Sequence, residues 1–502
     1  LILLWFTLVT RIRHEYIQSF RSKIQPEPKQ AGPQDWDARN VSIWNGIFRA
    51  LASEQEKSTL ESLDMTQEIR DPRLVPFLRR LILHENTRVQ LEALKQLYYY
   101  KDRNLVPTVE NLISSTTFEV QCEAFRYLFQ HFSGEQRRLY FEKYLSHENE
   151  QIAVAALSAV ARECRNNLEL QEIFQIREKI DTRFKQLKSI SDIEKVEFLK
   201  KSYAHIIGHA NIPELHGYLH LLLKNQSPAV LKEAIVAAGN SGKKEFVPII
   251  FRYWTEPDLQ DTVQQALASF GEEMIDILNH ILHDVREKKE IRLCIPAVIA
   301  SIESSKSAKV LTENLAENDL EIRFEVIKAL NALLARSPHL KIDSQHILKQ
   351  IFSEAKTYVD TLMMLSSQMQ LGQQSAAKNS SKSQALQTAR QQLVIALEQK
   401  LDLNLERIFR LLELRYPQEG MMHIYGGLRD PKTDLRINAV EFLDNVLEAN
   451  LKKFIIPIVE TTIVDAVIHD TLDRFDRTLP TELECLVSLM QADDNLLKTK
   501  AL

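Results

Sequence analysis

The chain has 502 residues, a net charge of −5 at pH 7, and only 12 glycines and 16 prolines. A charge this small on a chain of this length argues against a general nucleic-acid binder. Because residues that break helices are scarce, whereas Leu, Glu, Lys, Gln and Ala are abundant, the composition predicts an all-helical protein. Four cysteines without a C-x-x-C pair are expected to be buried free thiols in a reducing compartment: Cys122, Cys164, Cys294 and Cys485.

The first segment, residues 1–24, begins apolar (LILLWFTLVT) and continues basic. Ten residues cover roughly 15 Å, about half of a bilayer core. Basic residues at the border of an apolar run are typical of the cytoplasmic side of a membrane span: Arg11, Arg13, Arg21 and Lys23. We therefore expect the end of a transmembrane helix followed by a basic juxtamembrane helix. A buried N-terminal helix of a soluble protein is the alternative. The basic residues could touch anionic lipid headgroups or act only as solubilising charge.

Residues 25–40, QPEPKQAGPQDWDARN, contain three prolines and a glycine and are predicted to be a linker. From Val41 onward the pattern is helical, and Asn318–Leu334 shows it most clearly. Its apolar residues fall on one stripe with a period near 3.6: Ile322, Val326, Ala329, Leu330 and Leu333. Asn318 or Asp319 can cap the first turn. Charged residues on the other faces, Arg323 among them, are expected to be mostly solvated.

The position of Ile322 recurs along the chain, mostly at intervals of 29–33 residues. The copies are Val89, Val120, Ile152, Phe198, Val230, Thr262, Ile291, Ile322, Leu435, Val464 and Leu497. A small residue is common four positions later, which lets a partner helix approach closely. Gly208, Gly239 and Gly271 recur where a helix C-cap is expected.

A shorter apolar helix precedes many copies, and proline often opens it, as at Pro76, Pro107, Pro213 and Pro248. Each unit is therefore predicted to be a helical hairpin of about 31 residues that buries its faces only by stacking. We predict an all-α solenoid of about eleven or twelve hairpins over residues 41–338 and 417–502. The second helices are expected to line its concave side.

Two intervals break the period. An extra helix is expected at about Leu168–Lys188. Residues 339–416 are predicted to be a helical insertion, with helices near His346–Met369 and from Ala385 towards Leu414, and a mobile loop at residues 371–384. Insertions of this kind often carry contacts, so this one is a candidate interaction feature. The last residues stop midway through a unit, and the natural chain is expected to continue.

No pattern of catalytic, cofactor-binding or metal-ligating residues stands out, and we predict a protein that is not an enzyme. GNSGKK at Gly239–Lys244 lacks the GxxxxGK[ST] spacing of a phosphate loop, and no strand precedes it. Four histidines are close enough in sequence to be a candidate zinc site: His205, His209, His216 and His220. It has no H-E-x-x-H order, and packing between helices is the expected role of His205. His280 and His283 are weaker candidates.

The repeats resemble HEAT repeats of the short, HEAT-like class. AVLKEAIVAAGNSGKKEFVPII and DLRINAVEFLDNVLE carry the resemblance, as does an arginine just after the repeat position (Arg292, Arg323, Arg436). It covers about residues 71–502 and implies an armadillo-like helical scaffold that binds protein. Tetratricopeptide repeats fit less well, because their unit is longer and their Trp/Gly/Tyr pattern is missing.

Two segments also resemble the ADP/ATP-type nucleotide translocase family. LWFTLVTRIRHEYIQSFRSKI is similar to the end of the last membrane helix of that family, and Ile424–Leu447 is similar to a segment of bacterial members in which HEAT repeats follow the carrier. The resemblance implies nucleotide transport by a membrane part outside this sequence, a cyclic-nucleotide-binding domain downstream, and a place on the cytoplasmic face of a bacterial inner membrane. No transport residue of the family maps onto this chain.

The sequence thus favours a non-catalytic scaffold or regulatory cytosolic region of a membrane protein, which binds a protein partner or couples the carrier to a regulatory domain. It implies no nucleic-acid partner and no cofactor. A free-standing soluble HEAT-repeat adaptor in the cytoplasm is the alternative. A HEAT-like lyase, or a metalloenzyme using the His205–His220 cluster, is the third hypothesis.

Overall fold

The computed structural model describes residues 41–53, 55–67, 69–115, 117–375, 381–430, 432–461 and 479–491. These residues form helices and turns, and none of them lies in a strand. They divide into two compact units, here called the N-terminal unit (up to Gly271) and the C-terminal unit (from Glu272). The predicted membrane segment 1–24 and the linker 25–40 lie outside the described residues.

Among the helices that are described, none combines the length and the apolar character that a membrane span requires.

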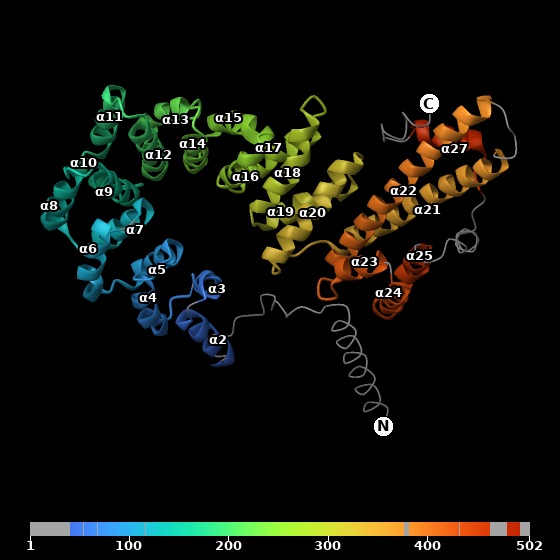
Figure 1. Ribbon diagram of the computed structural model, residues 1–502, viewed down its shortest axis with the longest axis horizontal. Helices are drawn as coiled ribbons and strands as arrows, with labels where there is room; N and C mark the ends of the chain where they lie inside the picture. Colours follow the sequence, from blue (N-terminus) through green and yellow to red (C-terminus); the bar gives the residue numbers. More distant parts are fainter. Residues whose placement is uncertain are drawn as a thin grey trace. The chain divides into compact units, whose positions relative to one another are not determined.

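The N-terminal unit is a succession of helical hairpins (Figure 1). Its α-helices are α2 (Val41–Ala52), α3 (Glu56–Thr66), α4 (Val75–Leu81), α5 (Thr87–Tyr100), α6 (Val106–Ser115), α7 (Phe118–Phe129), α8 (Gly134–Leu145), α9 (Glu150–Glu163), α10 (Leu168–Phe174), α11 (Ile176–Gln186), α12 (Ile193–Ala210), α13 (His216–Leu222), α14 (Pro228–Asn240), α15 (Val247–Phe251) and α16 (Gln260–Ala268). Short 3-10 turns accompany them: η1 (Pro72–Leu74), η2 (Arg103–Leu105), η3 (Leu187–Ser189), η4 (Pro213–Leu215), η5 (Lys244–Phe246), η6 (Arg252–Thr255) and η7 (Pro257–Leu259).

Proline opens the first helix of several hairpins, as predicted. Pro76 and Pro248 occupy the first turns of α4 and α15, and Pro213 begins the 3-10 turn before α13. The missing N–H of proline costs nothing there, because the first N–H groups of a helix have no partner within it.

The second helices of successive hairpins pack on one another: α5 on α7, α7 on α9, α9 on α12, α12 on α14 and α14 on α16. The repeat positions Val89, Val120 and Val230 are fully buried in these contacts. At Thr262 the predicted position is only partly buried, and Val263 takes the core place.

Two of the predicted C-cap glycines have a different role. Gly208 and Gly239 lie inside α12 and α14. A Cβ atom on Gly208 would lie 2.7 Å from Cα of Ala237, and one on Gly239 would lie 2.6 Å from the backbone oxygen of Ala266. Close approach of neighbouring second helices therefore requires glycine at both positions. Of the three predicted C-cap glycines, only Gly271 has the left-handed backbone of a helix end, with φ of 72°.

The extra helix expected at about Leu168–Lys188 is two helices, α10 and α11, followed by the η3 turn. Gln175 separates them with a left-handed φ of 47°. The prediction of a single helix was therefore wrong, because a residue with this backbone ends one helix and begins the next.

The C-terminal unit has the same hairpin plan with one enlargement. Its helices are α17 (Glu273–His283), α18 (Lys289–Ser301), α19 (Ser305–Glu313), η8 (Asn314–Ala316), α20 (Leu320–Arg336), α21 (Ser344–Ser375), α22 (Ser381–Arg415), α23 (Met421–Leu428), α24 (Thr433–Val446), α25 (Ala449–Glu460) and α27 (Glu482–Gln491). In α20 the predicted stripe is buried, and Asp319 caps the helix by accepting from the N–H groups of Glu321 and Ile322.

The long pair α21 and α22 occupies the predicted insertion, and the two helices pack along each other. Residues 371–375 and 381–384 are helical and not a loop, and residues 376–380 between them lie outside the described part. The repeat positions Val464 and Leu497 also lie outside it. Within each unit the described helices stack as an all-α, HEAT/ARM-like α-solenoid, and the C-terminal unit has a long helical hairpin inserted.

All four cysteines are free. Cys122, Cys164 and Cys485 are buried as predicted, whereas Cys294 on α18 is partly exposed.

Candidate functional site

Five second helices of the N-terminal unit, α5, α7, α9, α12 and α14, share a groove with a volume of about 380 Å³. Its floor consists of the small buried side chains of Cys122, Ser158 and Ser202, one from each of three successive helices. The half-buried side chains of Leu91 and Val236 also line it. The groove exists because small side chains lie where longer ones would fill the space between helices.

The polar atoms of the floor already have partners within the protein. The Ser202 hydroxyl donates to the backbone oxygen of Phe198 at 2.9 Å. The side chains of Cys122 and Ser158 are hydrogen-bonded to each other, and burial raises the pKa of the Cys122 thiol. The thiol therefore stays protonated at neutral pH, and the floor offers little chemistry beyond its shape.

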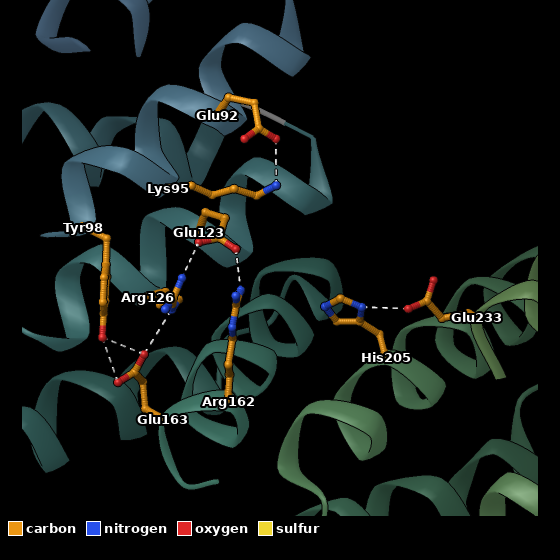
Figure 2. Close-up of polar contacts among 9 residues, drawn as sticks. All are labelled: Glu92, Lys95, Tyr98, Glu123, Arg126, Arg162, Glu163, His205 and Glu233. Carbon is orange, nitrogen blue, oxygen red and sulfur yellow. Dashed lines mark hydrogen bonds and ion pairs between the residues drawn. The ribbon is translucent and has the colours of Figure 1, made fainter. Parts of the chain in front are cut away.

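Two carboxylates and two arginines form a network that joins three of the helices (Figure 2). Glu123 of α7 accepts from Nη1 of Arg162 on α9 at 2.6 Å and from Nη1 of Arg126 at 3.3 Å. Nε of Arg126 donates to Glu163 at 3.1 Å, and the hydroxyl of Tyr98 on α5 donates to the same carboxylate. Burial lowers the pKa of Arg126, but Glu123 and Glu163 outweigh it, so the net shift is upward.

His205 and Glu233 form a second polar pair, between α12 and α14. Nδ1 of His205 lies 2.8 Å from Oε1 of Glu233 (Figure 2). His209 lies one turn further along α12, with its ring centroid 4.3 Å from that of His205. Burial lowers the pKa of His209 to about 3, and His205 and the arginines Arg162, Arg165 and Arg126 add to the shift. His209 is therefore neutral at pH 7.

The structure does not bring the four predicted histidines together. His216 and His220 lie on the first helix α13, where both rings contact Phe246. In the described ranges, no three His, Cys, Asp or Glu side chains are placed to hold a metal ion. His280 and His283 lie on α17, with His283 3.3 Å from Glu317. Residues 239–244 cover the end of α14 and the start of η5.

Sequence reasoning missed Glu123, Arg126 and Arg162, because it treated charges on the helices as solvated surface. The signal that could have found them is charge on the faces that successive second helices turn to one another.

The same error affected Arg323 in the C-terminal unit. Glu354 of α21 is fully buried, and Arg323 of α20 donates to it at 2.7 Å. From α22, Asn404 donates at 2.8 Å and Arg407 at 2.9 Å. Gln350 donates at 3.1 Å. This cluster connects the inserted helices to α20.

The sequence matches no protein-family model and no curated protein sequence.

Structure comparisons find helical proteins of low similarity. Human deoxyhypusine hydroxylase in complex with glycerol is 14% identical over 58% of this chain and 96% of its own, with a TM-score of 0.26. Kap121p is 12% identical over 93% of this chain and 53% of its own, with a TM-score of 0.31. The karyopherin Kap121p bound to the C-terminus of Cdc14p gives the same TM-score of 0.31 at 13% identity. This chain spans about half the length of Kap121p. The fold assignment rests on the helix packing described above.

Proposed function

We propose that this chain is a non-catalytic scaffold and that the groove of the N-terminal unit binds a segment of a partner protein. The observation that carries the proposal is a groove continuous over five second helices, with a floor of small side chains. Binding sites are concave, largely apolar, and supplied with a few oriented polar groups. The groove is concave and carries oriented polar groups, and Leu91, Phe118 and Val236 add apolar side chains to a lining that is otherwise mostly polar or charged.

The chemistry of its lining supports binding and not catalysis. The Cys122 thiol is protonated, since burial raises its pKa, and His209 is neutral, since burial lowers its pKa. His205 is held by Glu233. A nucleophile normally needs a base within hydrogen-bond reach, and none of the described contacts joins His205 or His209 to Cys122, Ser158 or Ser202.

Selection of displayed random peptides on the whole chain tests the proposal. Peptides enriched on the chain should lose binding to Ser202→Phe, which fills the floor, and to Val236→Gln, which alters a half-buried side chain of the lining. Ser114→Phe, on the exposed face of the first helix α6, is the matched control and should bind as the unchanged chain does. Circular dichroism checks that each variant folds.

Enriched peptides that bind both groove variants as tightly as the unchanged chain would place the binding surface elsewhere. Failure to enrich any peptide whose binding depends on the groove would remove the proposal.

We also propose, from sequence resemblance alone, that this scaffold lies on the cytoplasmic face of a membrane, next to a nucleotide carrier. The support comes from residues 4–24 and from Ile424–Leu447, which span much of the hairpin α23–α24. The natural full-length protein should stay with membranes through an alkaline wash. Recovery of all of it in the soluble fraction would favour a free-standing adaptor.

A further inference from the structure

We infer that the groove selects a peptide segment in which a carboxylate lies two residues from a bulky apolar side chain. This inference rests on the proposed function. It comes from an imbalance between the hydrogen-bond donors and acceptors that the groove presents.

The carboxylates of the groove are already paired. Glu123 accepts from two arginines, and Glu233 is 2.8 Å from His205. Glu119 lies 3.7 Å from Nζ of Lys201. A partner that brings cations would have to compete for these carboxylates, and a basic segment would also face Arg126 and Arg162.

Donors are in excess at one end of the groove, where α9 ends. Arg162 has five N–H groups, and its one described hydrogen bond uses Nη1; its side chain is 36% exposed. Three residues later, just beyond the lining of the groove, the exposed Arg165 donates from Nη2 to the backbone oxygen of Asn240, which lines it, at 3.2 Å. Guanidinium groups bind carboxylates through two parallel hydrogen bonds, so these arginines suit an acidic side chain.

The titration of His209 supports a positive potential at this end. The positive charges of Arg162, Arg165 and Arg126 contribute to the lowering of its pKa. The other groups that face His209 include His205 on its own helix, and the carboxylates Glu123 and Glu163 pair with two of these arginines.

The floor suits an apolar side chain. The Ser202 hydroxyl already donates its hydrogen within the protein and the Ser158 hydroxyl is bonded to Cys122, so a hydrogen-bond acceptor inserted above them would find no free donor there, and an unpaired polar group is costly to bury. The half-buried side chains of Leu91, Phe118 and Val236 line the same groove.

The spacing follows from helix geometry. Ser158 and Arg162 are four residues apart on α9, a rise of about 6 Å. An extended peptide advances roughly 3.3–3.6 Å per residue. Two residues therefore carry a peptide from the floor to the arginine end, and side chains two residues apart on an extended chain lie on the same face.

Four fluorescent peptide pools test the inference on the whole chain by fluorescence polarisation. They carry Leu or Phe two residues from Asp or Glu, Leu or Phe two residues from Lys or Arg, Leu or Phe two residues from Asn or Gln, and Ala two residues from Asp or Glu. The first pool should bind at least about tenfold more tightly than the others, since a hydrogen bond to a charged group is worth about that much.

Arg162→Gln and Arg165→Gln should each weaken the binding of the first pool by about tenfold and leave the binding of the Asn/Gln pool unchanged. Arg138→Gln, on the exposed side of α8, is the matched control and should change neither pool. Because Arg165 is exposed, its variant should fold even if that of Arg162 does not.

If the basic or neutral pool binds best and Ser202→Phe abolishes that binding, the groove is a protein-binding site but this inference is wrong. If no pool binds in a way that depends on Ser202, both the inference and the proposed function fall. A labelled 20-nucleotide single-stranded DNA that displaces the first pool and binds more tightly would also overturn the inference, in favour of nucleic acid.

Discussion

Glu123 in the N-terminal unit and Glu354 in the C-terminal unit are both carboxylates held by two arginines, yet their surroundings differ. The Glu123 side chain is 9% exposed, and its partner Arg162 is 36% exposed at the groove. Glu354 is fully buried, and its partners Arg323 and Arg407 are 12% and 3% exposed. The C-terminal cluster is closed to partners, whereas the N-terminal cluster keeps hydrogen-bond donors at a surface.

The same pairing of a carboxylate with two arginines therefore has two uses in this chain. A fully buried carboxylate with four donors fixes the register of three helices. The charged groups of this cluster are removed from water, so their hydrogen bonds to one another must replace those to water. A carboxylate at a groove fixes the arginines in place and leaves their other N–H groups for a ligand. Exposure of the arginines, and not the pairing itself, separates structure from recognition.

Glu354→Gln should have the largest effect on stability. The substitution keeps the shape of the side chain but leaves Arg323 and Arg407 without a counter-charge inside the cluster. We expect it to lower the free energy of unfolding by about 3–5 kcal/mol. Native-state hydrogen exchange should show the loss in α20, α21 and α22.

Glu303→Gln is the control, because it removes an exposed partner of Arg336. We expect a change below about 0.5 kcal/mol there. Equal effects of the two substitutions would mean that the Glu354 cluster is not closed.

Glu123→Gln should cost less, about 1–3 kcal/mol, because water can reach Arg162 once its partner is neutral. Urea unfolding followed by hydrogen exchange in α7 and α9 measures it. A cost equal to that of Glu354→Gln would erase the distinction between the two clusters.

Gly239→Ala tests the helix spacing on which the groove depends. Its new methyl group would press on the backbone of Ala266 in α16, so we expect a loss of about 1–3 kcal/mol.

Gly46→Ala in the exposed middle of α2 meets nothing within 4 Å and should instead stabilise by about 0.5–1 kcal/mol. Thermal unfolding of both variants gives the two signs. A stable Gly239→Ala chain would show that α14 and α16 can move apart.

His209 should make the N-terminal unit sensitive to acid. Its pKa is lowered from 6.5 to about 3 on folding, so the unfolded chain binds more protons between these values. The contribution of the neutral His209 ring to the free energy of unfolding is fully present above pH 6.5 and is lost as the pH falls from 6.5 towards 3.

Between pH 7 and pH 5.5 the unchanged chain should therefore lose about 1 kcal/mol more than His209→Gln. As the control, His339→Gln replaces an exposed histidine and should lose as much stability over this pH range as the unchanged chain does. Parallel slopes for His209→Gln and the unchanged chain would mean that His209 is solvated in the folded state.

Much of the fold could be predicted from the sequence, because burial of a helix stripe leaves a periodic record. Ile322 and its stripe, the proline-opened first helices and the long insertion are of this kind. The sequence did not show that Gly208 and Gly239 lie at helix contacts, since glycine serves both there and at helix ends. It also did not show the break at Gln175, a residue with no particular preference for a left-handed backbone.

The candidate site could not be predicted, for a physical reason. Glu123, Arg126 and Arg162 look like ordinary surface charges in one helix, and only the packing of α7 on α9 brings them together. Of the floor residues, only Ser202 holds a position that the repeat pattern marks for close helix approach, and Cys122 was predicted only as a buried thiol. Nothing in the pattern singles out Ser158.

Hydrogen exchange of the whole chain, with and without a saturating peptide selected on it, tests the central claim most directly. We expect added protection in α7, α9 and α12 of the unchanged chain, and no such change in the Ser202→Phe chain. Protection confined to the first helices α8 and α13, or to the C-terminal unit, would contradict a binding groove on the second helices.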